Sequence, residues 1–238
     1  MKQAIIVGAS SGLGWELAIQ LAKQGYQLGV MARREELLAE LVEQLPGTHF
    51  MQVTDVTQAE QSQQQLQDLI DRMGDVELIV LSSGVGLYEK KLDWTVEREM
   101  IDVNVRGFAA LAIVSYEHFV QRGGGHLAGI SSVASHLFGG LTLTYHATKA
   151  FVSNYLAGMR SRAARTKLPI TITTIEPGFV KTPMVQGNPV WMAPVEKGVA
   201  QMVKGLLKKK NHLYITRRWR LVAWVLYLMP QWLLRRFV

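Results

Sequence analysis

An apolar run, a glycine-rich turn and a helix-like stretch follow one another at the N-terminus of the chain. The run Ala4-Ile5-Ile6-Val7 has no polar side chain, which is typical of a strand buried in a parallel sheet. In the turn, residues 8–14 read Gly-Ala-Ser-Ser-Gly-Leu-Gly. Such glycines let the backbone approach a pyrophosphate, and the helix that follows points its N-terminal N–H groups at it. Taken alone, the turn is equally compatible with a tight strand-to-helix connection that binds nothing.

Strand-like and helix-like segments alternate through the rest of the chain. Further strands are predicted at 27–31, 49–53, 77–81, 126–131, 170–175 and 212–216, and helices at 15–22, 35–44, 58–73, 93–121, 145–165 and 195–210. This alternation predicts an α/β fold: a Rossmann-type, doubly wound parallel sheet with helices on both faces. The 238 residues suit a single such domain, and we expect it to span residues 1–216.

A tyrosine and a lysine lie four residues apart near the start of a predicted helix. Tyr145 and Lys149 therefore project from one helix face. An ammonium beside a phenol stabilises phenolate, so we expect the pKa of Tyr145 to fall below its usual value of about 10. Ser132, just after the strand predicted at 126–131, can offer a hydroxyl to the same substrate oxygen. Most Tyr-x-x-x-Lys pairs are only a buried ring beside a solvated lysine, so the pair needs support from the glycine-rich turn.

With these motifs in this order, the chain resembles the short-chain dehydrogenase/reductase family from Lys2 to about Thr182. The resemblance implies that Ser132, Tyr145 and Lys149 act on the substrate. It also implies that Asn104 fixes a proton-relay water near the lysine. An enzyme that interconverts a ketone or aldehyde and an alcohol is therefore expected. The alternative is a non-catalytic dinucleotide-binding sensor or scaffold, which would have no reason to keep all four residues.

The same resemblance implies an extended cofactor site. In it the glycine turn cradles the cofactor, Asp55 touches adenine, and the loop 177–182 holds the nicotinamide carboxamide. The expected contacts are Gly8, Ser10, Ser11, Gly12, Leu13, Gly14, Arg33, Arg34, Asp55, Val56, Ser83, Gly84, Tyr145, Lys149, Pro177, Gly178, Val180 and Thr182. Two places depart from the family pattern: Val7 stands where threonine is usual, and Leu81-Ser82-Ser83-Gly84 replaces Asn-Asn-Ala-Gly. The missing asparagines mainly tie the sheet together, so the departure concerns local rigidity more than chemistry.

The end of the second predicted strand bears on the choice of cofactor. A carboxylate there would bind the ribose 2′-hydroxyl of NAD, whereas a nearby arginine accommodates the 2′-phosphate of NADP. The chain reads Met31-Ala32-Arg33-Arg34, with two cations and no acid. Solvated arginines at a strand end are the alternative reading. We expect NADP(H) to be preferred, with NAD(H) as the alternative cofactor.

Cysteine and histidine usage limits other chemistry. The chain has no cysteine, which excludes disulfides and thiolate nucleophiles and suits a reducing cytoplasm. Its six histidines show no paired ligand spacing, so we expect no metal site.

The segment 183–194 is apolar and rich in proline, with Met184, Val185, Val190, Trp191 and Met192. In this fold such a segment is expected to cover the substrate. We therefore predict a small-molecule substrate, a hydrophobic or lipid-like carbonyl compound, although the same side chains could simply pack the segment onto the body. A homo-oligomer, a dimer or a tetramer, is also expected.

Charge is distributed unevenly along the chain. Residues 1–196 hold 16 Lys and Arg against 19 Asp and Glu, whereas residues 197–238 hold ten basic residues and no acidic one. The tail 217–238 combines five of these cations with an apolar run shorter than the about 20 residues that span a bilayer. Its tryptophans and arginines suit a helix lying on the inner face of a membrane, and the alternative is an arm on a second subunit. Nucleic acid is not expected, because the cations bracket an apolar run.

Overall fold

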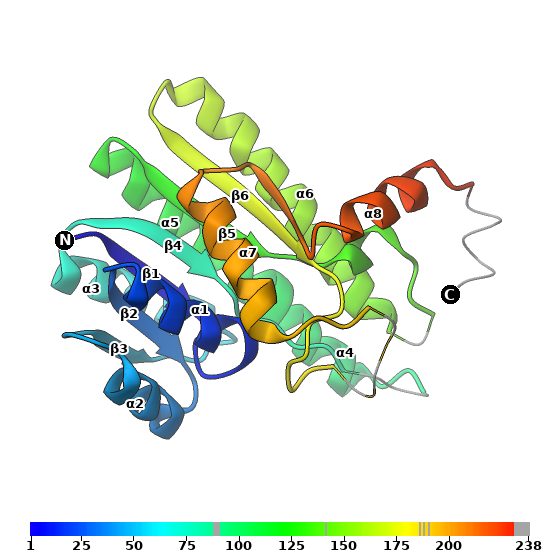
Figure 1. The fold of residues 1–238 in the computed structure, drawn as a ribbon, viewed down its shortest axis with the longest axis horizontal. Helices are drawn as coiled ribbons and strands as arrows, with labels where there is room; N and C mark the ends of the chain where they lie inside the picture. The colour runs from blue at the N-terminus through cyan, green and yellow to red at the C-terminus, as the bar shows by residue number, and fades with distance from the viewer. Residues whose placement is uncertain (88–90, 141, 186, 188, 190, 231–238) are drawn as a thin grey trace.

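The parallel sheet predicted from the sequence forms the centre of the fold (Figure 1). A computed structural model of the chain describes residues 1–87, 91–140, 142–185, 187, 189 and 191–230. Within them, seven strands pair in parallel in the order β3-β2-β1-β4-β5-β6-β7. The strands are β1 (Gln3–Val7), β2 (Gln27–Ala32), β3 (Phe50–Val53), β4 (Val76–Leu81), β5 (Gly125–Ile130), β6 (Ile170–Pro177) and β7 (His212–Ile215).

Helices cover both faces of this sheet, as predicted. One face carries α1 (Gly12–Lys23), α2 (Glu35–Gln44) and α7 (Val195–Leu207), and the other carries α3 (Ala59–Met73), α5 (Phe108–Arg122) and α6 (Leu143–Thr166). Successive side chains of a strand point to opposite faces, so Ile6 of β1 belongs to the first core and Ile5 to the second. The doubly wound fold is therefore confirmed. The chain reverses its winding direction between β1 and β4, and this reversal opens a crevice at the carboxyl ends of the strands.

The helix predicted at 93–121 is confirmed in extent, but a π-helical turn that was not predicted interrupts it. The structure divides it into α4 (Trp94–Ile101), the π-helical turn η1 (Asp102–Gly107) and α5. A π-turn inserts extra backbone without changing which residues are apolar, so hydrophobic periodicity does not reveal it. The π-turn ends at Gly107, which packs closely against the segment that follows β3. A Cβ at Gly107 would come within 2.4 Å of the carbonyl oxygen of Val56 in that segment.

The C-terminal segment continues past β7 into α8 (Trp219–Leu228). This helix packs against β7 and the short helix η2 (Val133–His136), and it projects from the end of the molecule in Figure 1. Within the described part of the chain, no helix has both the length and the apolar character needed to cross a membrane.

Candidate active site

A cavity of about 370 Å³ lies in the crevice at the carboxyl ends of the strands. It brings together residues from the glycine turn, the end of β2, the segments after β4 and β5, the start of α6 and the loop after β6. All of the predicted cofactor residues line this cavity except Gly14 and Asp55. Residues that the sequence did not single out as contacts also line it, among them Ala32, Thr54, Ser82, Val103, Ser131 and Met184.

The glycine turn has a shape that side chains would destroy. Gly8 has a φ of +87°, and a Cβ at Gly14 would lie 2.1 Å from the carbonyl oxygen of Gly8. Gly14 thus lets α1 approach the turn, which explains why it does not line the cavity. Ser11, the residue before α1, makes no side-chain hydrogen bond to the helix end. The first N–H groups of α1 are therefore not capped by that side chain, and this arrangement fits an incoming pyrophosphate.

Asp55 stabilises a turn. Its Oδ1 accepts hydrogen bonds from the backbone N–H of Thr57 at 3.0 Å and from the hydroxyl of Thr57 at 2.9 Å. The neighbours Thr54 and Val56 line the cavity. The hydroxyl of Thr54 is buried and has no hydrogen-bond partner among the described residues, so it could receive a polar group of a bound adenosine. The role of Asp55 toward adenine stays a prediction.

Two arginines occupy the end of the cavity beside the glycine turn. Arg34 places Nη2 2.8 Å from the hydroxyl oxygens of both Ser10 and Ser11, and its Nε donates to Ser10 at 3.2 Å. Arg33, adjacent to it, also lines the cavity, and no acidic side chain is among the lining residues that the structure describes. This end of the cavity is therefore electropositive.

Three of the four catalytic residues predicted from the sequence, Ser132, Tyr145 and Lys149, line the cavity and form its catalytic wall, whereas Asn104 does not line it. Ser132 precedes η2, where its Oγ accepts a hydrogen bond from the N–H of Ala134 at 3.1 Å. Tyr145 lies in the first turn of α6, and its ring is close enough to Gly86 that a Cβ there would be 3.1 Å away. Burial raises the pKa of Tyr145, and a hydrogen bond with Ser132 opposes that rise.

Lys149 is buried beside this tyrosine. Its Nζ donates to the carbonyl oxygen of Ile130 at 3.0 Å and lies 5.7 Å from the centroid of the Tyr145 ring. Burial lowers the pKa of Lys149 from 10.5 to about 8. The expected lowering of the Tyr145 pKa is therefore wrong for the protein alone, because desolvation of the phenolate dominates. Tyr145 consequently keeps its proton at neutral pH, which is the form that can donate one.

Asn104 sits in the π-turn η1 and is buried. Its Oδ1 accepts from the N–H of Val85 at 2.9 Å, and its Nδ2 donates to the carbonyl oxygen of Val85 at 2.8 Å and to the hydroxyl of Thr148 at 3.1 Å. A Cβ at Gly84 would lie 3.1 Å from the Nζ of Lys149 and 3.4 Å from the Oδ1 of Asn104. Asn104 thus ties the segment after β4 to α6 close to the lysine, and its role in holding a relay water stays a prediction.

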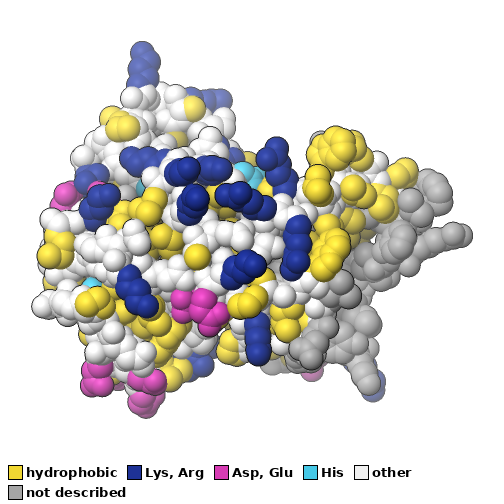
Figure 2. Space-filling model, in the orientation of Figure 1, with side chains coloured by type: hydrophobic (Ala, Val, Ile, Leu, Met, Phe, Trp, Pro, Cys, Tyr) yellow, Lys and Arg dark blue, Asp and Glu magenta, His cyan; other side chains and the backbone are white. Residues whose placement is uncertain are grey.

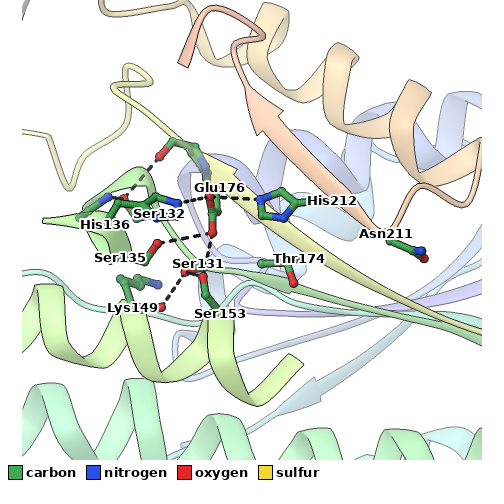
Figure 3. Close-up of polar contacts among 12 residues, drawn as sticks. Ser131, Ser132, Ser135, His136, Lys149, Ser153, Thr174, Glu176, Asn211 and His212 are labelled. Atoms are coloured by element: carbon green, nitrogen blue, oxygen red, sulfur yellow. Dashed lines mark hydrogen bonds and ion pairs between the residues drawn. The ribbon is translucent and has the colours of Figure 1, made fainter. Parts of the chain in front are cut away.

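Behind the catalytic wall lies a buried carboxylate that the sequence analysis missed (Figure 3). Glu176 is 1% exposed, and its Oε2 lies 2.8 Å from Nε2 of His136 and 3.1 Å from Nε2 of His212. Its Oε1 accepts a hydrogen bond from the hydroxyl of Ser153 at 2.9 Å. The only signal in the sequence is an acidic residue near the end of an otherwise uncharged strand. Pairing with two distant histidines depends on tertiary structure.

Ser131 connects this carboxylate to the active site. Its hydroxyl lies 2.7 Å from that of Ser153 and donates to the carbonyl oxygen of Lys149 at 2.8 Å. Because Ser131 and Glu176 immediately precede Ser132 and Pro177, the network fixes the backbone on two sides of the catalytic wall.

Replacing the buried carboxylate by an amide, Glu176→Gln, is expected to destabilise the fold by about 3 kcal/mol at neutral pH. Burial alone would raise the pKa of Glu176, but the hydrogen bonds and charges of His136 and His212 outweigh it and lower the pKa from 4.5 to about 2. A lowered carboxyl pKa contributes stability above 4.5 that is lost as the pH falls toward 2.

Urea unfolding of both proteins between about pH 7 and pH 2 measures this effect, and the variant should lose much of the wild-type pH dependence below about pH 5. The exposed Glu43 on α2 supplies the control Glu43→Gln, which should unfold like the wild type. Equal stability of Glu176→Gln and wild type at neutral pH would contradict the stabilising role assigned to the ionised carboxylate of Glu176.

The start of the C-terminal segment forms part of the structure behind the cavity. Trp219 is 9% exposed and covers Gly178, where a Cβ would lie 2.1 Å from the indole. Its ring packs edge-on against Phe179 and Trp191 at centroid distances of 5.6 and 6.1 Å. Arg218 donates a hydrogen bond to the carbonyl oxygen of Trp191 and stacks over its ring. The start of the tail thus packs against Trp191 and Phe179.

This packing corrects one expectation about the tail. The tryptophans of the tail were expected to face a membrane, but one of them, Trp219, is already buried against the loop after β6. In the segment 183–194, Met184 and Val185 line the cavity, while the indole of Trp191 is half exposed. The predicted Val190 lies outside the described residues.

Comparisons with known proteins agree with this geometry. A sequence model of the family described as short chain dehydrogenase matches residues 2–192. An uncharacterized oxidoreductase of Myxococcus xanthus is 35% identical over 217 residues, which make up 87% of this chain and 84% of the relative.

Solved structures share the fold. An alcohol dehydrogenase from the archaeon Thermococcus sibiricus, complexed with 5-hydroxy-NADP, has a TM-score of 0.78 and 26% identity, covering 90% of this chain and 95% of that one. A short chain dehydrogenase/reductase from Burkholderia phymatum, in complex with NAD, has a TM-score of 0.83, covering 94% of this chain and 92% of that one. Its 18% identity makes it evidence of the fold alone.

Proposed function

The chain belongs to the short-chain dehydrogenase family, and on that premise we propose that it is an NADP(H)-dependent reductase of hydrophobic ketones or aldehydes. It is an oxidoreductase acting on CH–OH groups, so the prediction of an enzyme rather than a cofactor-binding sensor is confirmed. The proposal rests on the residues that share one cavity. Ser132, Tyr145 and Lys149 line one part of it, and the glycine turn and two arginines line another.

The chemistry assigned to these residues is acid catalysis of a hydride transfer. When bound, the nicotinamide supplies a hydride to the carbonyl carbon. Tyr145, protonated at neutral pH, gives its proton to the carbonyl oxygen, and Ser132 donates a hydrogen bond to that oxygen. Lys149 holds the ribose hydroxyls with its buried ammonium, and Asn104 positions the water that returns a proton to the site.

The preference for NADP(H) is supported by the charges at the end of β2. Arg33 and Arg34 line the cavity where no acidic side chain would repel a 2′-phosphate. The relative from Thermococcus sibiricus carries an NADP derivative in the same fold, which is consistent with this choice.

The double variant Arg33→Ala/Arg34→Ala is expected to bind NADPH about 10–100-fold more weakly and NADH almost unchanged, because a charge-assisted contact contributes about 1.5–3 kcal/mol. Titration calorimetry with both cofactors measures this. Lys23→Ala, which removes an exposed cation at the end of α1, should leave both affinities unchanged. Equal affinities of the wild type for NADPH and NADH would contradict the preference.

The proposed substrate is a hydrophobic or lipid-like carbonyl compound. Met184 and Val185 give the cavity an apolar wall on the side of the segment 183–194. The test is NADPH oxidation with medium-chain ketones, aldehydes and β-keto acyl compounds, compared with sugars and hydroxy acids. Faster turnover of the polar compounds would overturn this substrate class.

We also propose where and how the enzyme works: in the cytoplasm, as a homodimer or homotetramer, with residues 1–216 as the catalytic domain. The tail 217–238 would contact the inner face of a membrane or, alternatively, a second subunit. The charge imbalance of residues 197–238 supports a partner with negative charge.

A further inference from the structure

The helix α8 carries an apolar stripe on its outer face. Leu221, Trp224, Val225 and Leu228 are 70%, 64%, 51% and 60% exposed. Their spacing places them on one side of the helix, while Ala223 on the opposite side is buried against the body. Figure 2 shows these hydrophobic side chains gathered at the end of the molecule, beside a group of Lys and Arg side chains. Four large apolar side chains exposed side by side on one helix indicate a contact surface.

A second cavity opens beside the same helix. It has a volume of about 480 Å³ and lies between α8, β7 and η2. Its walls are made by His136, Tyr214, Arg217, Arg220, Leu221, Ala223 and Trp224. The cavity therefore combines two guanidinium groups with two side chains of the apolar stripe, Leu221 and Trp224.

The charge of this cavity is positive. No acidic residue is among those that the structure shows lining it, and Glu176, behind His136, is buried and already receives hydrogen bonds from His136 and His212. The hydrogen bond to Glu176 raises the pKa of His136, which favours the charged form of the imidazole. Among the described residues, no carboxylate forms an ion pair with Arg217 or Arg220. Two guanidinium groups at one cavity suit a phosphate, because each guanidinium can donate two parallel N–H hydrogen bonds to phosphate oxygens.

We propose that α8 docks on a bilayer that contains anionic phospholipid. A lipid phosphate enters the second cavity and pairs with Arg217 and Arg220, and the stripe of Leu221, Trp224, Val225 and Leu228 enters the boundary between headgroups and acyl chains. The inference goes beyond the proposed reaction and does not rest on it. It assigns specific residues and a ligand to the contact proposed for the tail.

The charges disfavour a second copy of the chain as the occupant. In a two-fold contact both copies contribute the same patch, so an interface of α8 against α8 would hold the Arg217 and Arg220 of both copies and no acidic side chain from either helix. The like charges would repel, whereas an anionic surface attracts all of them. The stripe also belongs to a helix of only ten residues, which is a small surface for a stable dimer.

The experiment is co-sedimentation of the full chain with vesicles of phosphatidylglycerol and phosphatidylcholine, and with vesicles of phosphatidylcholine alone. Arg217→Gln/Arg220→Gln should bind the anionic vesicles about 30-fold more weakly, from about 1 kcal/mol per cation. Trp224→Gln/Leu228→Gln should also lose binding. The matched controls are Lys23→Gln/Arg165→Gln, which removes two exposed cations elsewhere, and Trp94→Gln, since Trp94 is 67% exposed on α4. Both controls should bind like the wild type.

Three results would overturn the proposal. The first is equal vesicle binding by the wild type and the two α8 variants. The second is that inorganic phosphate binds in calorimetry while anionic vesicles do not, which would make the cavity a site for a soluble anion. The third is that the wild type does not bind vesicles and Trp224→Gln/Leu228→Gln dissociates an oligomer, which would make α8 a contact between subunits. NADPH binding by every variant, measured in parallel, shows that the fold is intact and separates this outcome from a failure of the proposed reaction.

Discussion

Tyr145→Phe is expected to lower kcat by about 10²–10⁴-fold while leaving the affinity for NADPH close to that of the wild type. The substitution removes the phenolic proton and changes almost no volume. Burial raises the pKa of Tyr145, so the wild-type side chain is protonated and ready to donate at neutral pH. Without that hydroxyl, the carbonyl oxygen keeps only the hydroxyl of Ser132 beside it, and an aliphatic alcohol is a far weaker acid than a phenol.

Steady-state NADPH oxidation and cofactor titration measure the two quantities separately. Tyr155→Phe is the matched control, because Tyr155 lies on the same helix and its ring stacks on Phe151 at 5.3 Å, which phenylalanine would preserve. That variant should retain turnover. Wild-type kcat in Tyr145→Phe would mean that the proton comes from another group.

Lys149→Met is expected to abolish most turnover and yet stabilise the fold by about 2 kcal/mol at neutral pH. Burial lowers the pKa of Lys149 from 10.5 to about 8, so a charged Lys149 costs the folded state about 3 kcal/mol. Loss of the hydrogen bond to Ile130 offsets about 1 kcal/mol of the gain. The lysine is therefore kept at the expense of stability, as expected of a functional group.

The difference in folding stability between Lys149→Met and the wild type is expected to change with pH in one direction. Below about pH 8 both the folded and the unfolded wild type carry the charged lysine, so the cost is fully present. Between about 8 and 10.5 the unfolded chain binds more protons, and wild-type stability rises with pH. The advantage of Lys149→Met in urea unfolding should therefore shrink across that interval. Lys204→Met, at an exposed position of α7, should show no such change, and a Lys149→Met variant less stable than wild type at neutral pH would contradict the assignment.

The sequence predicted the fold well because its strongest signals are local. Continuous apolar runs and helical periodicity are set by burial on the two faces of the sheet, and α2 has the bounds that were predicted. The glycine turn was also predictable, since Gly8 and Gly14 are required by contacts within the same strand–turn–helix unit.

What the sequence did not predict depends on contacts between distant residues. The π-turn that carries Asn104 leaves the apolar pattern unchanged. Glu176 acquires its histidine partners only when η2, β6 and β7 meet, and Trp219 is buried only because Gly178 lies beneath it. The pKa of Tyr145 was predicted in the wrong direction because spacing reports the neighbouring lysine but not the burial of the phenol.

The most direct measurement of the central claim follows a labelled hydride. NADPH deuterated at C4 of the nicotinamide, incubated with the enzyme and a medium-chain ketone, should yield an alcohol that carries deuterium on the carbinol carbon. Tyr145→Phe should form this product at least about 100-fold more slowly. Deuterated alcohol from the wild type, with NADH as a poorer donor than NADPH, is the result the account predicts. Bound NADPH that leaves every hydrophobic carbonyl compound unreduced would contradict it.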